Sequence, residues 1–259
     1  MRRFRLGMAQ MSACPGNMCR NLDTMKNLLS RTDADFVCFP EMSLSGYGAA
    51  YELEPADFSC GPVKELARIS DDTGITVCAG ISEHRNGRAY ITQFTVEDGN
   101  IIGSYRKTHL GNDELKTYTP GNSIVPFDSK YCRLGFQLCW ENHFPEITRK
   151  LAIEGADLVL MPHASFLNSK RRKSTWDRSL PAKAYDNTVY VGACNHLNGI
   201  SGGGSCILDA RGRTVAEDYG GTEGILSADL SPEPLEKIRN SGGSMRDLYF
   251  LPLRRPAIY

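Results

Sequence analysis

Two hydrophobic periods alternate along the chain, one typical of strands and the other typical of helices. Short, continuous apolar runs at residues 4–11, 35–40 and 74–83 predict buried strands. Between these runs, residues 19–32 and 61–74 carry apolar side chains at helical spacing, which predicts helices with one buried face. Because the two patterns alternate from the first residues onward, we expect βαβ units.

The rest of the chain continues this alternation. Residues 89–107 predict two strands joined by a hairpin turn at EDGN. The elements expected after residue 130 are a strand at 134–139, a helix at 144–155, a strand at 156–165, a helix at 174–187 interrupted near Pro181, a strand at 188–196, a hairpin at 205–218 and a strand at 224–230. This order predicts a largely parallel, layered α/β fold with helices covering the sheets. Since no Pro/Ser-rich linker interrupts it, we expect one domain over residues 1–259.

Charge limits the classes of partner. The chain has 30 Lys+Arg and 30 Asp+Glu residues, so its formal net charge is zero and no global field favours nucleic acid or an anionic membrane. The basic start MRRFRLGMAQ is not followed by the apolar core of a signal peptide, and no apolar run reaches the roughly 18 residues of a membrane span. We therefore expect a cytoplasmic protein without nucleic-acid or membrane partners. SKRRKS (169–174) and SGGGS (201–205) are interpreted as a solvated loop and a tight turn.

Nine cysteines lie along the chain without a C-x-x-C pair, which argues against a disulfide framework and a zinc ribbon. Most are expected to be small buried hydrophobic residues, as Cys38, Cys78 and Cys206 are in strand-like runs. Cys139 differs because it ends the apolar run LGFQLC, shortly before a helix that begins at Pro145. Its thiol is therefore expected at a strand-to-helix turn.

Three strand-like runs end in reactive side chains, namely Glu41, Lys107 and Cys139. If the strands are parallel and adjacent, these groups meet at one rim, because ligands bind at the carboxyl ends of parallel strands. We expect the helix N-terminus and Lys107 to lower the pKa of the Cys139 thiol, and Glu41 to be its general base. The Lys107 ammonium and the backbone N–H of Trp140 would then hold an oxyanion. The alternative at this point is a helix-capping Glu41 and a surface Lys107.

The sequence around these three residues resembles the nitrilase superfamily of carbon–nitrogen hydrolases. The similar blocks are FPEMSLSGY around Glu41, YRKTHL around Lys107 and LCWENHFPE around Cys139, and further similar segments cover almost the whole chain. The resemblance implies a four-layer αββα sandwich in which Cys139 is the nucleophile, Glu41 the general base and Lys107 the group that stabilises the tetrahedral intermediate. It also implies a second pocket glutamate, Glu114, that positions Lys107 and the substrate, with no metal and no organic cofactor.

The bond that is hydrolysed stays open at this stage. WEN after the nucleophile is similar to true nitrilases, whereas HFPE is similar to amidases and N-carbamoyl-amine hydrolases. We rank amide hydrolysis first, N-carbamoyl amine hydrolysis second and nitrile hydrolysis third. A non-catalytic binding protein, and a Cys–His hydrolase or acyltransferase using His109 or His143, are the alternatives from other classes.

Substrate and subunit contacts complete the expectations. The residues expected to bind a small amide, carbamoyl or nitrile substrate are Tyr47, Trp140, Asn142 and His163. Arg171, Arg172 or Lys173 could reach a substrate carboxylate. The segment 246–259 is too apolar for a free tail. The resemblance suggests that it crosses a subunit interface in a homodimer or higher homo-oligomer, and packing on its own subunit is the alternative.

Overall fold

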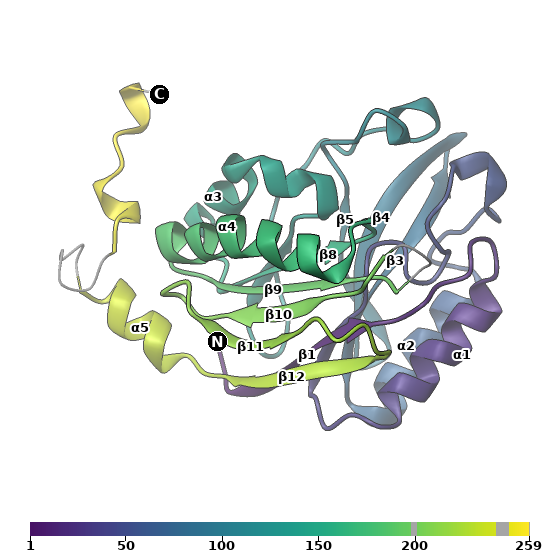
Figure 1. The fold of residues 1–259 in the computed structure, drawn as a ribbon, viewed down its shortest axis with the longest axis horizontal. Helices are drawn as coiled ribbons and strands as arrows, with labels where there is room; N and C mark the ends of the chain where they lie inside the picture. Colours follow the sequence, from purple (N-terminus) through teal and green to yellow (C-terminus); the bar gives the residue numbers. More distant parts are fainter. Residues whose placement is uncertain (198–200, 242–248, 259) are drawn as a thin grey trace.

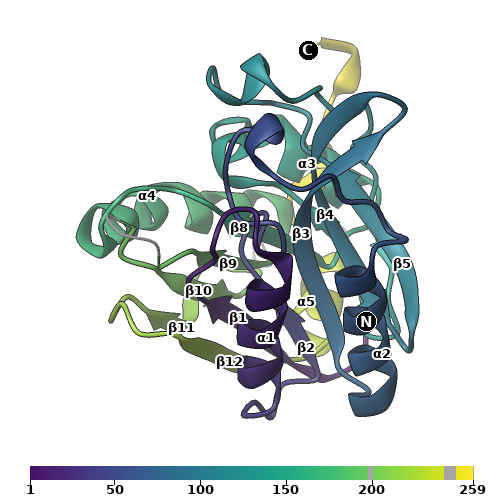
Figure 2. The same ribbon diagram turned by 90° about the vertical axis from the view of Figure 1, so that its right-hand side faces the viewer.

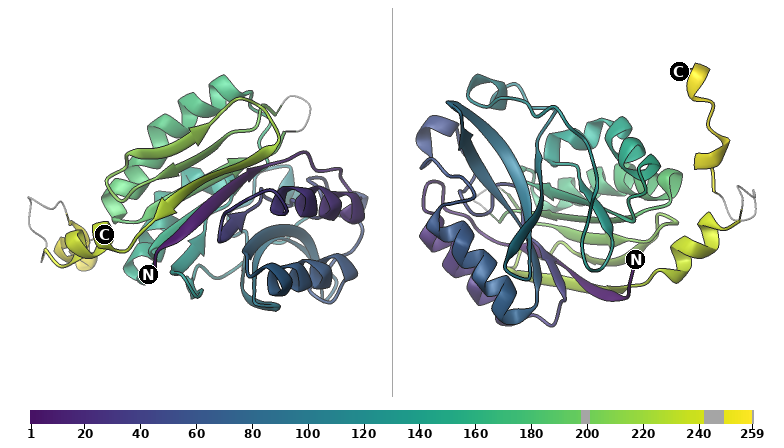
Figure 3. Two further views of the ribbon diagram at one scale, coloured as in Figure 1. Left: turned by 90° about the horizontal axis from the view of Figure 1, so that it is seen from below. Right: turned by 180° about the vertical axis from the view of Figure 1, so that it is seen from behind.

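Two six-stranded sheets face each other, and a pair of helices covers the outer face of each sheet (Figures 1 and 2). The structure is a computed structural model in which residues 1–197, 201–241 and 249–258 are described. The first sheet has the strand order β12-β1-β2-β3-β4-β5, and the second has the order β11-β10-β9-β8-β7-β6. Seen from below, the layers follow one another as helices, sheet, sheet and helices (Figure 3). The predicted four-layer αββα sandwich is confirmed.

The elements of the two sheets and their helices come from alternating parts of the chain. The strands of the first sheet are β1 (Phe4–Gln10), β2 (Phe36–Cys38), β3 (Thr76–Arg85), β4 (Arg88–Glu97), β5 (Asn100–Arg106) and β12 (Gly224–Leu230). Those of the second sheet are β6 (Phe127–Asp128), β7 (Arg133–Phe136), β8 (Leu158–His163), β9 (Tyr190–Asn195), β10 (Ser205–Leu208) and β11 (Thr214–Asp218). The α-helices are α1 (Met18–Leu29), α2 (Gly61–Thr73), α3 (Pro145–Ile153), α4 (Ser169–Asn187) and α5 (Glu233–Arg239). The short 3₁₀ turns are η1 (Ala50–Glu52), η2 (Glu114–Lys116), η3 (Cys139–His143), η4 (Leu251–Leu253) and η5 (Pro256–Ile258).

Three buried clusters fill the three spaces between the four layers. The central cluster lies between the sheets and includes Leu6 and Met8 of β1. Ala9 of the same strand belongs to the cluster beneath α1 and α2, because successive strand residues point to opposite faces. The third cluster packs α3 and α4 on the second sheet around Trp176 and Leu180. Both sheets are therefore covered on both faces, as their near-continuous apolar runs require.

The prediction of a largely parallel arrangement is wrong. Parallel pairing is confined to β1–β2–β3 and β7–β8–β9. In the described part of the chain, the other six strand pairs are antiparallel. The reason is that only connections long enough for a crossover give parallel neighbours, whereas short turns such as Asp98–Gly99, with φ of 47° and 77°, give antiparallel hairpins.

Two expectations for the segment around residues 169–187 are also wrong. SKRRKS is not a loop but the first two turns of α4, which begins after Asn168. The side chain of Asn168 accepts a hydrogen bond from the N–H of Arg171 at 3.0 Å and so caps the helix. The helix also continues through Pro181. The proline removes one backbone N–H donor, and the packing of α4 on the second sheet offsets that loss.

All nine cysteines are free thiols, and Cys38, Cys78 and Cys206 are buried as expected. In the described part of the chain, no helix is long and apolar enough to cross a membrane. Of the C-terminal segment 246–259, residues 246–248 and 259 lie outside the described residues. In residues 249–258, which follow α5 at one end of the sandwich (Figures 1 and 3), Tyr249 and Leu251 pack against buried clusters of the same chain, whereas Leu253 and Ile258 are exposed.

Candidate active site

The carboxyl ends of β2, β5 and β7 bring the three predicted catalytic residues to one end of the sandwich. The Nζ atom of Lys107 lies 2.8 Å from Oε1 of Glu41 and 2.7 Å from Oε1 of Glu114, and all three side chains are buried. The strands are not adjacent, because β3 and β4 separate β2 from β5, and β7 belongs to the second sheet. The structure therefore brings Lys107 into contact with Glu41 and places both near Cys139, and two sheets rather than one supply these residues.

Glu41 precedes a tight turn at Met42, whose backbone packs directly against Gly80 of β3. Met42 has a φ of 53°, in the left-handed region. A Cβ on Gly80 would lie 2.2 Å from the backbone N of Met42, so glycine is required on the neighbouring strand β3. His196 donates a hydrogen bond from Nε2 to the backbone carbonyl of Glu41 at 2.7 Å. These contacts fix the direction in which the Glu41 carboxylate points.

Burial tunes Glu41 for proton transfer. Burial raises the pKa of Glu41 to about 7, although the Lys107 ammonium opposes the rise. Oε2 of Glu41 is buried and has no hydrogen-bond partner among the described residues. The site therefore contains an open acceptor whose pKa lies near neutrality, which suits a general acid and base.

The Cys139 thiol has the opposite pKa shift from the one expected. Burial and the Glu41 carboxylate raise the pKa of Cys139 to about 12, and Lys107 and the backbone N–H of Ala164 lower it only in part. The helix dipole acts weakly because α3 begins at Pro145 and the residues between form the 3₁₀ turn η3. Cys139 itself has a φ of 37°, in the left-handed region that residues other than glycine rarely adopt. The Cys139 thiol therefore requires a base to become a thiolate.

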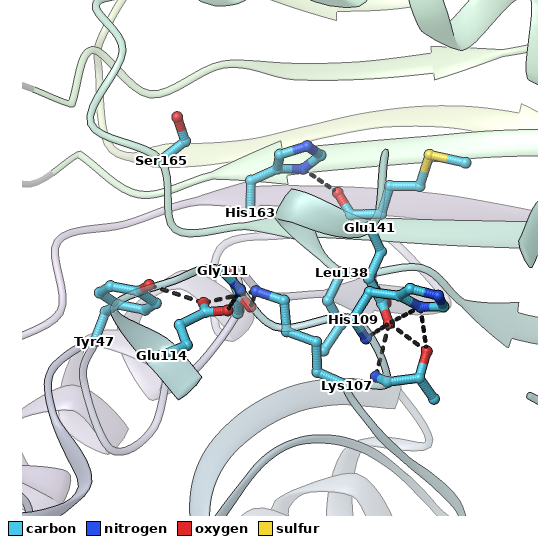
Figure 4. A network of polar contacts seen from close by, with 12 residues as sticks. Tyr47, Lys107, His109, Gly111, Glu114, Leu138, Glu141, His163 and Ser165 are labelled. Carbon is cyan, nitrogen blue, oxygen red and sulfur yellow. Dashed lines mark hydrogen bonds and ion pairs between the residues drawn. The ribbon is translucent and has the colours of Figure 1, made fainter. Parts of the chain in front are cut away.

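Glu114 and Tyr47 hold the other side of Lys107. Glu114 begins the turn η2, and its Oε2 accepts a hydrogen bond from the N–H of Gly111 at 2.7 Å. The Tyr47 hydroxyl donates to Oε1 of Glu114 at 2.8 Å, beside the Lys107 ammonium (Figure 4). Two carboxylates raise the pKa of Lys107, so the side chain stays charged despite its burial.

A cavity of about 410 Å³ opens next to these groups. Three residues of its wall touch the site, because Tyr47 binds Glu114, Ala164 lies against the Cys139 sulfur and His196 binds the Glu41 backbone. The remaining wall is mostly small and neutral, formed by Ser12, Ala13, Pro15, Ser165, Phe166, Leu197 and Ser201. The size suits a small molecule with few heavy atoms.

Tyr47 lines this cavity, but the other three predicted substrate-binding residues are not among the residues of its wall. Asn142 donates from Nδ2 to Ser179 at 3.0 Å and lines a separate hollow between α3 and α4. His163 is buried, donates from Nδ1 to the Met161 carbonyl at 2.7 Å and accepts from the Trp176 indole at 3.3 Å, so both ring nitrogens are used. The Trp140 side chain is 48% exposed. The structure therefore does not bring Asn142 or the His163 nitrogens to the cavity beside Cys139.

Neither histidine of the Cys–His alternative approaches the thiol. The His109 ring stacks on Phe144 at a centroid distance of 4.3 Å. His143 packs edge-on against Trp140 at 5.3 Å. Among the described residues, neither ring makes a hydrogen bond to Cys139, and no group of three His, Cys, Asp or Glu side chains could hold a metal ion.

Two further residues near the site were not predicted. Glu141 is completely buried and binds backbone on both sides of the site, and His196 binds Glu41 as described above. A glutamate two residues after Cys139 was visible as the E of WEN, but only the structure shows that it points inward.

The three cations considered for a substrate carboxylate differ in their exposure. Arg172 is 4% exposed, whereas Arg171 is exposed. Lys173 forms ion pairs with Asp177 and Glu217.

Comparison with known proteins gives a consistent result. A sequence model of a family described as carbon-nitrogen hydrolase matches residues 5–240. Omega-amidase NIT2 of Xenopus tropicalis is 29% identical over 259 aligned residues, which cover 92% of each protein. The crystal structure of a carbon-nitrogen hydrolase from Helicobacter pylori G27 has a TM-score of 0.82 at 25% identity, with 100% of this chain and 97% of that chain covered. Saccharomyces cerevisiae Nit3, a member of branch 10 of the nitrilase superfamily, has a TM-score of 0.79 at 25% identity, with 95% and 97% covered.

Proposed function

As a member of the carbon–nitrogen hydrolase family, this chain cleaves carbon–nitrogen bonds, and we propose that Cys139 is its nucleophile, Glu41 its general acid and base, and Lys107 its oxyanion-binding group. The predicted class, a carbon–nitrogen hydrolase of the amidase type, is confirmed by the family match and by the omega-amidase relative. The alternatives of N-carbamoyl amine hydrolysis, nitrile hydrolysis and a non-catalytic role find no support in the relatives described above.

In the first half-reaction, Glu41 takes the thiol proton of Cys139 as the sulfur attacks the amide carbon. A C–S bond forms, and the carbonyl π electrons move onto the oxygen, where the Lys107 ammonium and the Trp140 backbone N–H stabilise the negative charge. Glu41 then gives its proton to the amide nitrogen, the C–N bond breaks, and ammonia leaves. The product on the enzyme is a thioester of Cys139.

The second half-reaction uses the same groups with water. Glu41 removes a proton from a water molecule, whose oxygen attacks the thioester carbon. The tetrahedral intermediate collapses with breakage of the C–S bond, and the sulfur recovers its proton from Glu41. Glu114 and Tyr47 keep the Lys107 ammonium in place through both steps. The observation that carries this proposal is the buried Glu41–Lys107–Glu114 chain of ion pairs, with one free oxygen on Glu41.

The proposal is tested by ammonia release and intact-protein mass with short amides, N-carbamoyl amino acids and nitriles. We expect ammonia from the amides, and a mass increase equal to the acyl group on Cys139. An acyl adduct located on any other residue, or turnover without Cys139, would contradict the proposal.

Arg172 indicates which amide is the substrate. Arg172 is 4% exposed, and its Nε atom is buried without a hydrogen-bond partner among the described residues. It packs over the Trp176 ring at 5.1 Å and makes no ion pair with a described residue. Arg172 and Cys139 are close enough that each affects the pKa of the other. Because a buried cation without a counter-ion is costly, we infer that the substrate supplies the anion. The substrate class that satisfies this requirement is the terminal monoamide of a small dicarboxylic acid.

Arg172→Met is expected to lower kcat/KM for succinamate by about 100-fold, mainly through a higher KM, since a charge-assisted pair with a carboxylate is lost. Hydrolysis of 4-methylpentanamide, in which an isopropyl group replaces the carboxylate, is expected to change less than about threefold because Arg172 then has no anion to bind. Initial rates of ammonia release measure both. Arg171→Met, at the exposed neighbour, is the matched control. An equal loss for the two substrates would show that Arg172 does not recognise the carboxylate.

We also propose that a second copy of the chain covers the face formed by α3 and α4. A hollow of about 490 Å³ lies between these helices. Its wall includes Asn142 and Asn187, whose Oδ1 atoms are buried and have no hydrogen-bond partner among the described residues. Ile153 at the end of α3 is 49% exposed and lines a neighbouring hollow, which shares Glu146 and Arg149 with the first. Unpaired acceptors next to apolar surface are typical of a face that is completed by a partner.

Light scattering is therefore expected to give a mass of at least twice the 28.6 kDa of one chain. Ile153→Asp places a charge in the contact and is expected to shift the protein to the mass of one chain. Val215→Asp, at an exposed apolar residue of β11, is the control and should leave the mass unchanged. A wild-type mass of 28.6 kDa would contradict the proposal.

A further inference from the structure

Glu141 is a completely buried carboxylate that receives five hydrogen bonds. Oε2 accepts from the N–H of Leu138 at 2.7 Å. Oε1 accepts from the Tyr105 hydroxyl at 2.6 Å, from the N–H and the hydroxyl of Thr108 at 2.8 Å each, and from the N–H of His109 at 3.1 Å. Burial and the neighbouring Glu141 carboxylate raise the pKa of Tyr105, so its hydroxyl keeps its proton and donates. The carboxylate is thus fully satisfied without a cation, a state that demands a fixed set of donors.

These donors belong to two segments that carry different catalytic groups. Leu138 directly precedes Cys139 at the end of β7, in the second sheet. Thr108 and His109 directly follow Lys107 at the end of β5, in the first sheet. In the described part of the chain, no backbone ladder joins a strand of one sheet to a strand of the other, so the Glu141 carboxylate joins the two catalytic segments where backbone pairing does not.

The segment that carries Glu141 is itself rigid. Gln137 donates from Nε2 to the backbone carbonyls of Glu141 at 2.5 Å and of Phe144 at 3.0 Å. Its Oε1 accepts from the hydroxyl of Thr148 in α3. The turn η3 is therefore anchored on the second sheet and on α3. Through its hydrogen bonds to Thr108 and His109, Glu141 then fixes the segment that follows Lys107 relative to this turn.

From this geometry we propose that Glu141 is a positioning residue that sets the separation between the Lys107 ammonium and the Cys139 sulfur. It does not touch the substrate. The inference rests on the proposed roles of Lys107 and Cys139. It also explains why a carboxylate is needed, because three of the five donors are backbone N–H groups that cannot turn away. A glutamine would place its NH₂ against one of the two sets of donors.

The first test is Glu141→Gln, with Tyr105→Phe as the matched control. We expect Glu141→Gln to lower kcat for amide hydrolysis by about 100-fold with KM changed less than threefold, because the oxyanion is held only in the transition state. Tyr105→Phe removes one donor and leaves four, and we expect a loss of less than about fivefold. A Glu141→Gln enzyme with wild-type kcat, or one whose KM alone rises, would overturn the proposal.

A double-mutant cycle separates positioning from a general effect on the fold. Acylation of Cys139 by p-nitrophenyl acetate is followed in Lys107→Met, Glu141→Gln and the double variant, because this activated ester still reacts when Lys107 is absent. If Glu141 acts through Lys107, the double variant reacts no more slowly than Lys107→Met alone. Independent, multiplying losses would refute the inference. A Lys107→Met enzyme with full amide hydrolysis would instead refute the proposed role of Lys107.

Should Glu141→Gln not fold, the cycle is run with Tyr105→Phe/Thr108→Val, which removes two side-chain donors and keeps the carboxylate. We expect this variant to react about tenfold more slowly than wild type, and no further loss when Lys107→Met is added. Thermal unfolding and far-UV circular dichroism of each variant establish that the compared enzymes are folded. Multiplying losses in this second cycle would overturn the proposal equally.

Discussion

Cys139→Ser is expected to reduce amide hydrolysis by about 10⁴-fold or more, the largest effect of any single substitution in this chain. Serine keeps the shape of the side chain and its hydrogen-bonding capacity, so the cavity is preserved. However, an alcohol is far less acidic than a thiol, and Glu41, with a pKa of about 7, cannot deprotonate it effectively. An oxygen ester would also be a different intermediate from the thioester proposed above.

The measurement is ammonia release under saturating amide, together with intact-protein mass after brief mixing. Cys60→Ser provides the control, because Cys60 is also partly exposed and lies at the start of α2, away from the site. We expect full activity and a normal acyl adduct in Cys60→Ser, and no adduct in Cys139→Ser. Activity within tenfold of wild type in Cys139→Ser would exclude Cys139 as the nucleophile.

Glu41→Gln is expected to lower kcat by about 10³-fold, because it removes the group that takes and returns the proton in both half-reactions. The pH dependence of kcat/KM gives an independent test of this role. The carboxylate must be ionised to accept the thiol proton, so the wild-type kcat/KM is expected to fall as the pH drops below about 7. Above that value kcat/KM should stay level through at least pH 9, because the pKa of Cys139 is about 12 and that of Lys107 is raised.

The residual activity of Glu41→Gln should lack this acidic limb. Glu97→Gln is the control, since Glu97 is another buried glutamate of the first sheet, at the opposite end of the β4–β5 hairpin from Lys107. Its expected profile is that of the wild type. If the acidic limb persists unchanged in Glu41→Gln, another group controls it and the general-base assignment fails.

The helices and strands were predictable because each is a local pattern. Residues 18–29 bury Leu22, Met25 and Leu29 on one helical face, and EDGN forms the hairpin turn that its Asp-Gly pair predicts. The start of α4 was missed because a run of basic residues reads as a solvated loop, although Asn168 before it is a good N-cap. Strand direction was also missed, since pairing partners lie far apart in the sequence and periodicity carries no information about them.

The features of the site also divide into those that the sequence predicts and those that depend on the assembled fold. Glu41, Lys107 and Cys139 were predictable from strand ends and from family resemblance, and the structure brings them together. The raised pKa of Cys139 was not predictable, because it depends on burial and on the distance to Glu41, which only the assembled sheets define. Glu141 was missed for the related reason that its five hydrogen bonds come from two segments that lie far apart in the sequence, residues 105–109 and Leu138.

The pairing of β1 with β12 has a consequence for biosynthesis. Residues 4–10 leave the ribosome well before residues 224–230, with which they form their antiparallel ladder. Until then, β1 is an open edge of a sheet that already contains β2 and β3, and such an edge can recruit a strand from another nascent chain. The nascent chain therefore exposes the unpaired edge of β1 until residues 224–230 have emerged.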